Sequence, residues 1–389
     1  MSTSAKRNWA DLPLDLLGDI ASRLTLRDYR RFCRVCTSWA SVKSPYTLYL
    51  LLPGDDGEYQ NLLRATDHTS LPAPALPALR GRWCVGSQDD WLSTLDEFSQ
   101  LSLLNLITRE EIKLPSIAPL PQIDAFSKVV CGRQYWSRIF FPPEDFRLLA
   151  SVSKVVFSPN PSPASYTAVA FLDYPAKFLY TRAGDDKWTA AEELDRAKDV
   201  IYRDGRFLAV FGNGEAVAVD LGADSRPSAF LASRAADSLF SVKYLVDSAG
   251  DLLQVRRYLR RTTVGDENRI VIKTTRIQVF KCDVKRRVWV PVESLGDRSL
   301  LVGTCCSVSF SAQEIPGLKG NRVYFTEDYW VFLHAGAVRD AQYDVGVFRL
   351  EDGSLEPCLP IPSPKPNFGP PIWVILPPAL LDVGVDCKI

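Results

Sequence analysis

Apolar residues recur at helical spacing only near the amino terminus of this chain. Between Asn8 and Val42, Leu16, Ile20 and Leu24 lie four residues apart, and Leu17 extends the same stripe of a short amphipathic helix. Thr25 can cap a second helix with an apolar stripe of its own. The residues of that second stripe are Tyr29, Phe32, Val35, Cys36 and Trp39.

The amino-terminal pattern predicts a small helical module that needs a partner. Pro13 is placed in a first helical turn, where a proline costs no hydrogen bond, and Asp11 and Asp15 lie near the positive end of the helix dipole. About 35 residues bury too little surface to be stable alone. The apolar stripe is therefore expected to meet another protein or the next domain.

From about residue 47 onward, short runs of Val, Phe, Tyr, Leu and Trp alternate with turn signals. The clearest segment is 200–221, where Asp204-Gly205 and Asn213-Gly214 separate three apolar runs. These dipeptides are favoured in tight hairpins because they tolerate positive φ. We therefore expect an antiparallel meander here. Similar pairs of runs surround residues 249–251, 283–287, 352–353 and 184–186, and a further triplet spans 91–114.

Strand-turn-strand units recur along the whole remainder of about 340 residues. A region of some 20 strands or more must protect its unpaired sheet edges from pairing with other chains. Radial repetition of four-stranded blades leaves only short, protected edges. The length favours a β-propeller of six blades, with five to seven possible. The segments 158–165 and 260–269 are interpreted as insertions, and the proline-rich segment 71–77 as a loop within the β region. Two packed β-sandwiches are the alternative, less favoured because no linker divides the region. The fold class is thus mostly β, with an N-terminal three-helix module and one propeller.

Composition narrows the function classes. The chain has 389 residues with 46 Lys+Arg against 46 Asp+Glu, so it lacks the broad positive field used for nucleic acids or anionic membranes. No apolar run approaches the ~18 residues of a membrane span, and no signal peptide is recognised. Nine unevenly spaced Cys favour a reducing compartment, the nucleus or the cytoplasm or both. Only two His and one Met are present, so few residues could serve in histidine-based catalysis or metal binding.

Candidate chemical motifs are weak. Cys33 and Cys36 have Cys-x-x-Cys spacing, but no second pair lies at zinc-site spacing, so they are interpreted as small apolar core residues. Cys305-Cys306 are adjacent in a strand-like run, where side chains point to opposite faces. Gly212-Asn213-Gly214 is interpreted as a hairpin turn. We therefore assign no catalytic, cofactor-binding or metal-binding residue.

Three basic clusters, Arg256-Arg257, Arg260-Arg261 and Lys285 to Arg287, have two interpretations. They could form one positive patch for an acidic partner if their hairpins are neighbours. A solvated strand edge, protected by charge against aggregation, is the favoured interpretation.

The helical pattern resembles an F-box, the module that docks onto the Skp-type adaptor of cullin-RING ubiquitin ligases. The residues that carry this resemblance are Asp11 to Leu17, Ile20, Leu24, Asp28, Arg31 and Val35 to Trp39. The remainder resembles the plant F-box family with a C-terminal KIB-type β-propeller, also called domain of unknown function 295. The matching stretches are 86–92, 104–108, 182–188, 199–207, 320–325, 346–348 and 371–377. The chain departs at 104–108, where the family usually has a proline after the Asn.

The resemblance implies an F-box at residues 8–46 and a propeller at 47–389, which would act as the substrate-recognition subunit of an SCF-type (Skp-cullin-F-box) ubiquitin ligase. It implies no catalytic activity and no cofactor. The expected partners are a Skp-type adaptor, a cullin-RING ligase and an unknown protein substrate, with no nucleic acid and no membrane. The expected adaptor-binding residues, some of which would instead form the module's own core, are Leu12, Pro13, Leu16, Leu17, Ile20, Leu24, Val35, Cys36 and Trp39.

Two alternatives remain open. The apolar stripe could pack only against the propeller. The chain could also be a lectin-like propeller or a propeller enzyme with an incidental helical N-terminus, for which carboxylates, histidines or metal ligands should converge at one end of the propeller.

Overall fold

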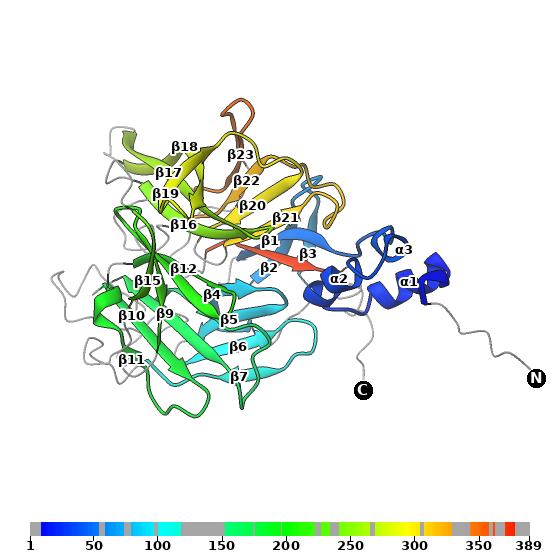
Figure 1. Cartoon of the computed structure of the whole chain (residues 1–389), viewed down its shortest axis with the longest axis horizontal. Coiled ribbons are helices and arrows are strands. Elements are labelled where there is room, and N and C mark those ends of the chain that lie inside the picture. The colour runs from blue at the N-terminus through cyan, green and yellow to red at the C-terminus, as the bar shows by residue number, and fades with distance from the viewer. Residues whose placement is uncertain are drawn as a thin grey trace, which may run out of the picture.

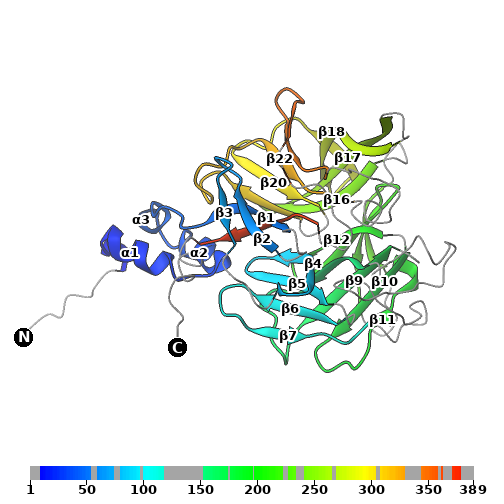
Figure 2. The same ribbon diagram turned by 180° about the vertical axis from the view of Figure 1, so that it is seen from behind.

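The computed structural model shows a small helical module beside a mostly β body built of six sheets (Figures 1 and 2). It describes residues 9–53, 59–73, 79–96, 100–117, 152–173, 176–195, 197–221, 227–233, 241–264, 269–303, 307–328, 343–357, 361 and 370–377. Cys305-Cys306 and residues 74–77 of the proline-rich segment lie outside these residues. No helix among the described residues is long and apolar enough to cross a membrane.

The helical module contains the expected three short α-helices, but the apolar stripe from Tyr29 to Trp39, expected on one helix, is divided between the last two. They are α1 (Leu14–Ala21), α2 (Leu26–Phe32) and α3 (Thr37–Ala40), preceded by the 3₁₀ turn η1 (Trp9–Asp11). The Oγ1 atom of Thr25 accepts a hydrogen bond of 3.1 Å from the backbone N–H of Asp28, so the predicted cap of α2 is confirmed. Pro13 precedes α1 at its N-cap position, one residue earlier than expected.

Six sheets form the blades of the propeller, so the favoured blade number is confirmed. Blade 1 contains β25 (Ile372–Leu376), β1 (Thr47–Pro53), β2 (Tyr59–Arg64) and β3 (Ser70–Pro72); blade 2 contains β4 (Arg82–Gln88), β5 (Trp91–Asp96), β6 (Leu101–Asn105) and β7 (Glu111–Lys113). Blade 3 contains β8 (Val152–Phe157), β9 (Thr167–Asp173), β10 (Ala176–Arg182) and β11 (Thr189–Ala190), followed by η3 (Glu192–Leu194). Blade 4 contains β12 (Ala197–Arg203), β13 (Arg206–Phe211), β14 (Ala216–Val219) and β15 (Pro227–Ala232).

The remaining two blades depart from the simple meander. Blade 5 contains β16 (Ser241–Ser248), β17 (Asp251–Val264), β18 (Arg269–Asp283) and β19 (Val288–Val292). Blade 6 contains β20 (Arg298–Val302), β21 (Ser307–Ser311), β22 (Arg322–Phe325), β23 (Gly346–Arg349) and β24 (Leu355–Pro357). Blade 6 therefore has five strands, and β20 pairs in parallel with β22, which differs from the expected antiparallel meander. In the segment 260–269, expected as an insertion, residues 260–264 and 269 instead belong to the paired strands β17 and β18.

Ring closure joins the two ends of the propeller sequence. Strand β25 pairs with β1, so the C-terminal strand completes the first blade. Near the centre, Lys154 Nζ of β8 contacts Asp199 Oδ1 of β12 at 2.6 Å and Ser307 Oγ of β21 at 3.1 Å. Side chains from blades 3, 4 and 6 therefore meet, as radial packing requires.

Local backbone conformation follows the turn signals of the sequence. The pairs Asp204-Gly205 (φ 49° and 82°) and Ala249-Gly250 (φ 52° and 89°) both adopt positive φ, which suits the tight two-residue hairpin turn. Gly86 has a different role. A Cβ atom at this position would lie 2.2 Å from the carbonyl oxygen of Val155, so only glycine lets β4 approach β8 this closely.

Candidate functional site

The helical module has a hydrophobic core of its own. Its buried residues are Leu17, Ala21, Leu26, Tyr29, Phe32, Val42 and Tyr46. The hydroxyl of Tyr29 donates a hydrogen bond of 3.0 Å to the carbonyl oxygen of Val42, and the hydroxyl of Tyr46 donates to the carbonyl oxygen of Leu24. These bonds fix the helices to the segment that leads into β1, so the module presents a defined outer surface.

That outer surface is unusually apolar. Five large apolar side chains of the module are exposed, and they define what we call the apolar face: Trp9 (72%), Leu14 (59%), Leu16 (47%), Ile20 (39%) and Val35 (60%). In the described part of the chain, only four other large apolar side chains are as exposed, all on the propeller. A short module with this many exposed large apolar side chains is expected to bind a partner.

The structure divides the predicted adaptor-binding residues into two sets. Pro13, Leu16, Ile20 and Val35 are exposed. Leu17 is fully buried, and Leu12, Leu24 and Trp39 pack half-buried against the module's core, while Cys36 is half-buried at the start of α3.

Two residues of the apolar face were missed by the sequence analysis. Leu14 directly follows Pro13 in the Leu-Pro-Leu run, which was a usable signal, but it lies off the stripe of Leu17 and Leu24. Trp9 precedes the first α-helix, so helical periodicity could not find it.

Trp39 supports the apolar face from beneath. Its ring lies 4.5 Å from the Phe32 ring, centroid to centroid, and its Nε1 atom donates a hydrogen bond of 3.1 Å to the carbonyl oxygen of Trp9. Trp39 therefore links α2 to the 3₁₀ turn that carries Trp9.

We expect Trp39→Ala to loosen the module, because the substitution removes both the contact with the Phe32 ring and the hydrogen bond to Trp9. The expected loss of local stability is about 1–3 kcal/mol for this half-buried side chain. Amide hydrogen exchange of residues 26–42 should accelerate, whereas Trp39→Phe should retain most of the protection. Unchanged exchange in Trp39→Ala would show that Trp39 does not support the face.

The module is fixed to the propeller through α2. Arg30 Nη2 lies 3.4 Å from Glu314 Oε2, and the Arg30 guanidinium lies 5.4 Å from the centre of the Phe310 ring in blade 6. Ile375 of blade 1 packs against the module's core. Contacts with two blades hold the apolar face in a set direction.

A buried carboxyl group of blade 2 lies at the start of α2. Asp90 is 4% exposed, and its Oδ1 atom has no hydrogen-bond partner. Burial and the neighbouring charge of Asp89 raise the pKa of Asp90 to about 7, although a hydrogen bond from the backbone of Leu26 opposes the shift. The folded protein therefore holds this proton more tightly than the unfolded chain does.

Protonation of Asp90 makes the free energy of unfolding depend on pH. Because the pKa is raised on folding, the favourable contribution of protonated Asp90 is complete below pH ~4 and is lost as the pH rises through about 7. The free energy of unfolding should therefore fall between pH 5 and pH 8 by up to about 2–3 kcal/mol relative to Asp90→Asn. Urea denaturation of both proteins at these two pH values measures the difference. An equal pH dependence of the free energy of unfolding in both proteins would show that the pKa of Asp90 is not raised.

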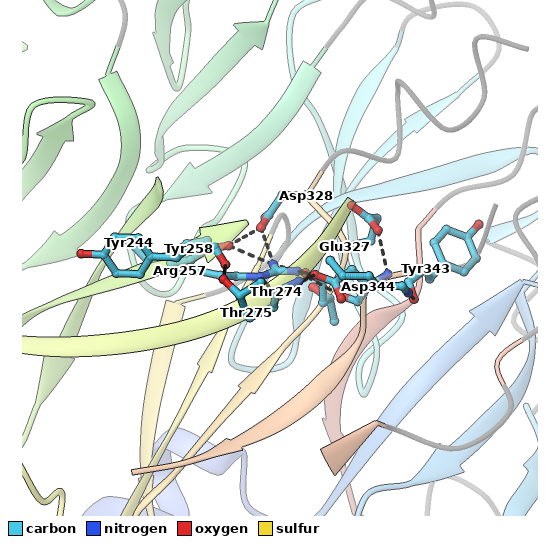
Figure 3. Close-up of polar contacts among 11 residues, drawn as sticks. Tyr244, Arg257, Tyr258, Thr274, Thr275, Glu327, Asp328, Tyr343 and Asp344 are labelled. Atoms are coloured by element: carbon cyan, nitrogen blue, oxygen red, sulfur yellow. Dashed lines mark hydrogen bonds and ion pairs between the residues drawn. The ribbon is translucent and has the colours of Figure 1, made fainter. Parts of the chain in front are cut away.

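A second polar cluster lies between blades 5 and 6, centred on Arg257 (Figure 3). Its Nη1 atom lies 2.6 Å from Asp328 Oδ2 and donates to the carbonyl oxygen of Thr326, and its Nη2 atom lies 2.6 Å from Asp344 Oδ2. The Nε atom donates to Thr274 Oγ1 at 2.6 Å. The guanidinium also lies 4.5 Å from the centre of the Phe325 ring.

The Arg257 cluster is a structural element. Burial alone would lower the pKa of Arg257, but the surrounding charges, among them Asp328 and Asp344, raise it above its usual value, so the side chain stays charged. All its nitrogen atoms have partners, which is the arrangement that a buried charge requires.

The favoured interpretation of Arg256 and Arg257 as part of a solvated strand edge is therefore wrong. Both side chains are buried, and the Arg256 guanidinium lies 3.7 Å from the centre of the Phe280 ring. Their strand, β17, is an inner member of its sheet, with partners on both sides. Alternation along the strand does not by itself distinguish such a position from an edge.

The described residues contain no group of three or more His, Cys, Asp or Glu side chains placed to hold a metal ion. Cys33 and Cys36 are free, half-buried thiols at the end of α2 and the start of α3.

Comparison with known proteins assigns the two parts of the chain. The F-box domain matches residues 9–48, and the KIB1-4 beta-propeller matches residues 60–349, which is most of the chain. The chain belongs to the KIB1-4 β-propeller family. It is an F-box protein of that family, as the resemblance implied.

Relatives of this F-box protein occur in Arabidopsis thaliana. The chain is 26% identical to F-box protein SKIP23 over 404 residues, which cover 94% of this chain and 95% of that protein. It is also 26% identical to F-box protein At2g17036 over 408 residues, again covering 94% of this chain and 95% of the relative. An F-box implies binding to a Skp-type adaptor within an SCF complex, and the F-box adaptor family is generally non-catalytic.

Proposed function

We propose that this protein is the substrate-recognition subunit of an SCF-type ubiquitin ligase. The apolar face of the F-box docks onto the Skp-type adaptor, and the propeller recruits a protein for ubiquitination. The observation that carries the proposal is the apolar face itself, because five large apolar side chains are exposed on a module whose family docks by a helical surface. Aromatic and aliphatic anchors of this kind supply most of the energy in such interfaces.

The protein contributes proximity to the reaction. A substrate held by the propeller has its lysines at a high effective concentration near a conjugating enzyme that another subunit carries. The α2 contacts to blades 1 and 6 support this role, because a fixed angle between F-box and propeller limits the volume that the substrate explores. No residue of this chain needs to make or break a bond.

The rival function, a lectin-like or catalytic propeller, has less support. It needs acids, bases or metal ligands that converge on an accessible site. In the buried cluster around Arg257, the carboxylates of Asp328 and Asp344 are already paired with the guanidinium. Paired carboxylates of this kind stabilise a fold and leave no free group for chemistry.

Co-expression of the tagged full chain with a Skp-type adaptor and a cullin tests the proposal. We expect both proteins to co-purify with the chain in equal amounts, and specific cellular proteins to accumulate on the complex when the proteasome is inhibited. Recovery of folded chain without adaptor would overturn the proposal.

A further inference from the structure

Blade 5 carries a protruding hairpin. Strands β17 and β18 have 14 and 15 residues, whereas β16 of the same blade has 8. Strand β16 pairs with β17 only as far as Tyr258, and β19 pairs with β18 only from Val279 onward. Residues 259–264 and 269–274 therefore pair only with each other, and we call them the β17–β18 arm.

The arm points away from the F-box. At the other end of β17, Ser248 lies 2.8 Å from Ser309, which is the neighbour in sequence of Phe310, the ring beneath Arg30 of the F-box. The F-box thus lies toward the Ser248 end of blade 5, and the arm extends from the opposite end. Figures 1 and 2 agree, because both views place β17 and β18 far from the helices.

One face of the arm and its base is basic. Arg260 pairs across the hairpin with Lys273, and Tyr258, two residues before Arg260, pairs with Arg276. Paired residues share a face of a sheet, as do residues two positions apart on a strand. The register shifts by one residue between these two pairs, but Tyr258 and Arg260 stay two positions apart on β17, so the four side chains lie on one side of the hairpin, which we call the basic face.

Two charges of the basic face, those of Arg260 and Arg276, are available to a partner. Arg260 and Arg276 are exposed, and neither forms an ion pair with an acidic residue of the described part of the chain; Arg276 Nη2 donates to Gln278 Oε1 at 3.2 Å. The Arg276 guanidinium lies 4.4 Å from the centre of the Tyr258 ring, and Lys273 Nζ donates to the carbonyl oxygen of Tyr343 at 3.0 Å. The chain as a whole carries a formal net charge of +0, so the local excess of positive charge on the basic face differs from the charge balance of the whole chain.

The base of the arm is rigid because the Arg257 cluster holds it. Asp344 Oδ2 accepts hydrogen bonds from the backbone N–H and the Oγ1 atom of Thr274, at 2.8 and 2.6 Å, as well as from Arg257 (Figure 3). Both strands of the arm are therefore tied to blade 6 at one point. A surface that is ordered before binding loses little conformational entropy when a partner docks.

We propose that the basic face of the β17–β18 arm docks an acidic segment, rich in Asp and Glu, of the protein that the propeller recruits. This inference rests on the proposed function, whose substrate class it names. Complementary charge accelerates encounter and selects the partner, and the half-buried Tyr258 ring holds the exposed Arg276 guanidinium in place. A nucleic acid fits less well, because stable binding to a phosphate backbone uses more cations than the two exposed arginines of the basic face.

The test uses the purified full chain and a fluorescent Glu-rich peptide, with binding followed by anisotropy at 50 and 200 mM salt. The test variant is Arg260→Glu with Arg276→Glu, and the matched control is Lys285→Glu with Arg286→Glu, which makes the same charge change at exposed residues of the β18–β19 turn. We expect at least a tenfold loss of affinity in the arm variant and less than a twofold loss in the control.

Peptide binding and adaptor co-purification are measured separately, so that each tests one proposal. Equal losses in both variants, no binding of the peptide, or tighter binding of single-stranded DNA than of the peptide would overturn the inference. Co-purification with the Skp-type adaptor should be unchanged in the arm variant. Co-purification with the adaptor therefore tests the proposed function independently of peptide binding.

Discussion

Replacing Leu16 and Ile20 together by aspartate is expected to weaken adaptor binding by at least about 100-fold, a loss of roughly 3 kcal/mol. Both side chains are exposed members of the apolar face on α1, so the free protein tolerates the change. In the complex, each carboxylate would be buried without a partner, which is costly. Surface plasmon resonance with an immobilised Skp-type adaptor measures the loss.

The thermal unfolding of this double variant serves as its control. Because neither residue belongs to the buried core of the module, the melting temperature should stay within about 2 °C of the wild type. Retained affinity, within threefold of the wild type, would exclude α1 from the interface.

Arg257→Met is expected to destabilise the propeller by about 3–5 kcal/mol, the range for breaking a buried ion pair from one side. The guanidinium is 1% exposed and holds Asp328 and Asp344, which would remain buried without their cation. Methionine fills much of the volume but supplies no hydrogen-bond donor. Urea denaturation at pH 7 measures the change in the free energy of unfolding.

Arg276→Met on the same hairpin is the matched control, because Arg276 is exposed and stacks on Tyr258. It should change the free energy of unfolding by less than about 0.5–1 kcal/mol. If Arg257→Met cost no more than Arg276→Met, the Arg257 cluster would not be the structural element described above.

Local features of the fold could be predicted from the sequence where one residue type determines the backbone. Asp204-Gly205 predicted a hairpin because few other pairs adopt positive φ so readily, and Thr25 predicted a helix start because its hydroxyl caps a free backbone N–H. The spacing of Leu16, Ile20 and Leu24 likewise predicted α1. The number of blades followed from length and strand count.

Features that depend on distant parts of the chain could not be predicted in this way. Helical spacing placed Leu16 and Leu17 on one stripe, but only tertiary packing exposes the first and buries the second. The partners of Arg257 come from Asp328 and Asp344, 71 and 87 residues away, so its burial has no local signal. The parallel pairing of β20 with β22 also has no local signal, because β21 lies between the two strands in the sequence and pairs on the other side of β20.

A comparison of two valines tests the central claim, that the apolar face of the F-box binds the adaptor, most directly. Val35 on the F-box and Val284 on blade 5 are almost equally exposed, at 60% and 65%, so the substitution to aspartate makes the same chemical change in two places. Isothermal titration of the full chain with a Skp-type adaptor should show at least a tenfold loss for Val35→Asp and no loss for Val284→Asp. Equal affinities for the two variants would contradict the account.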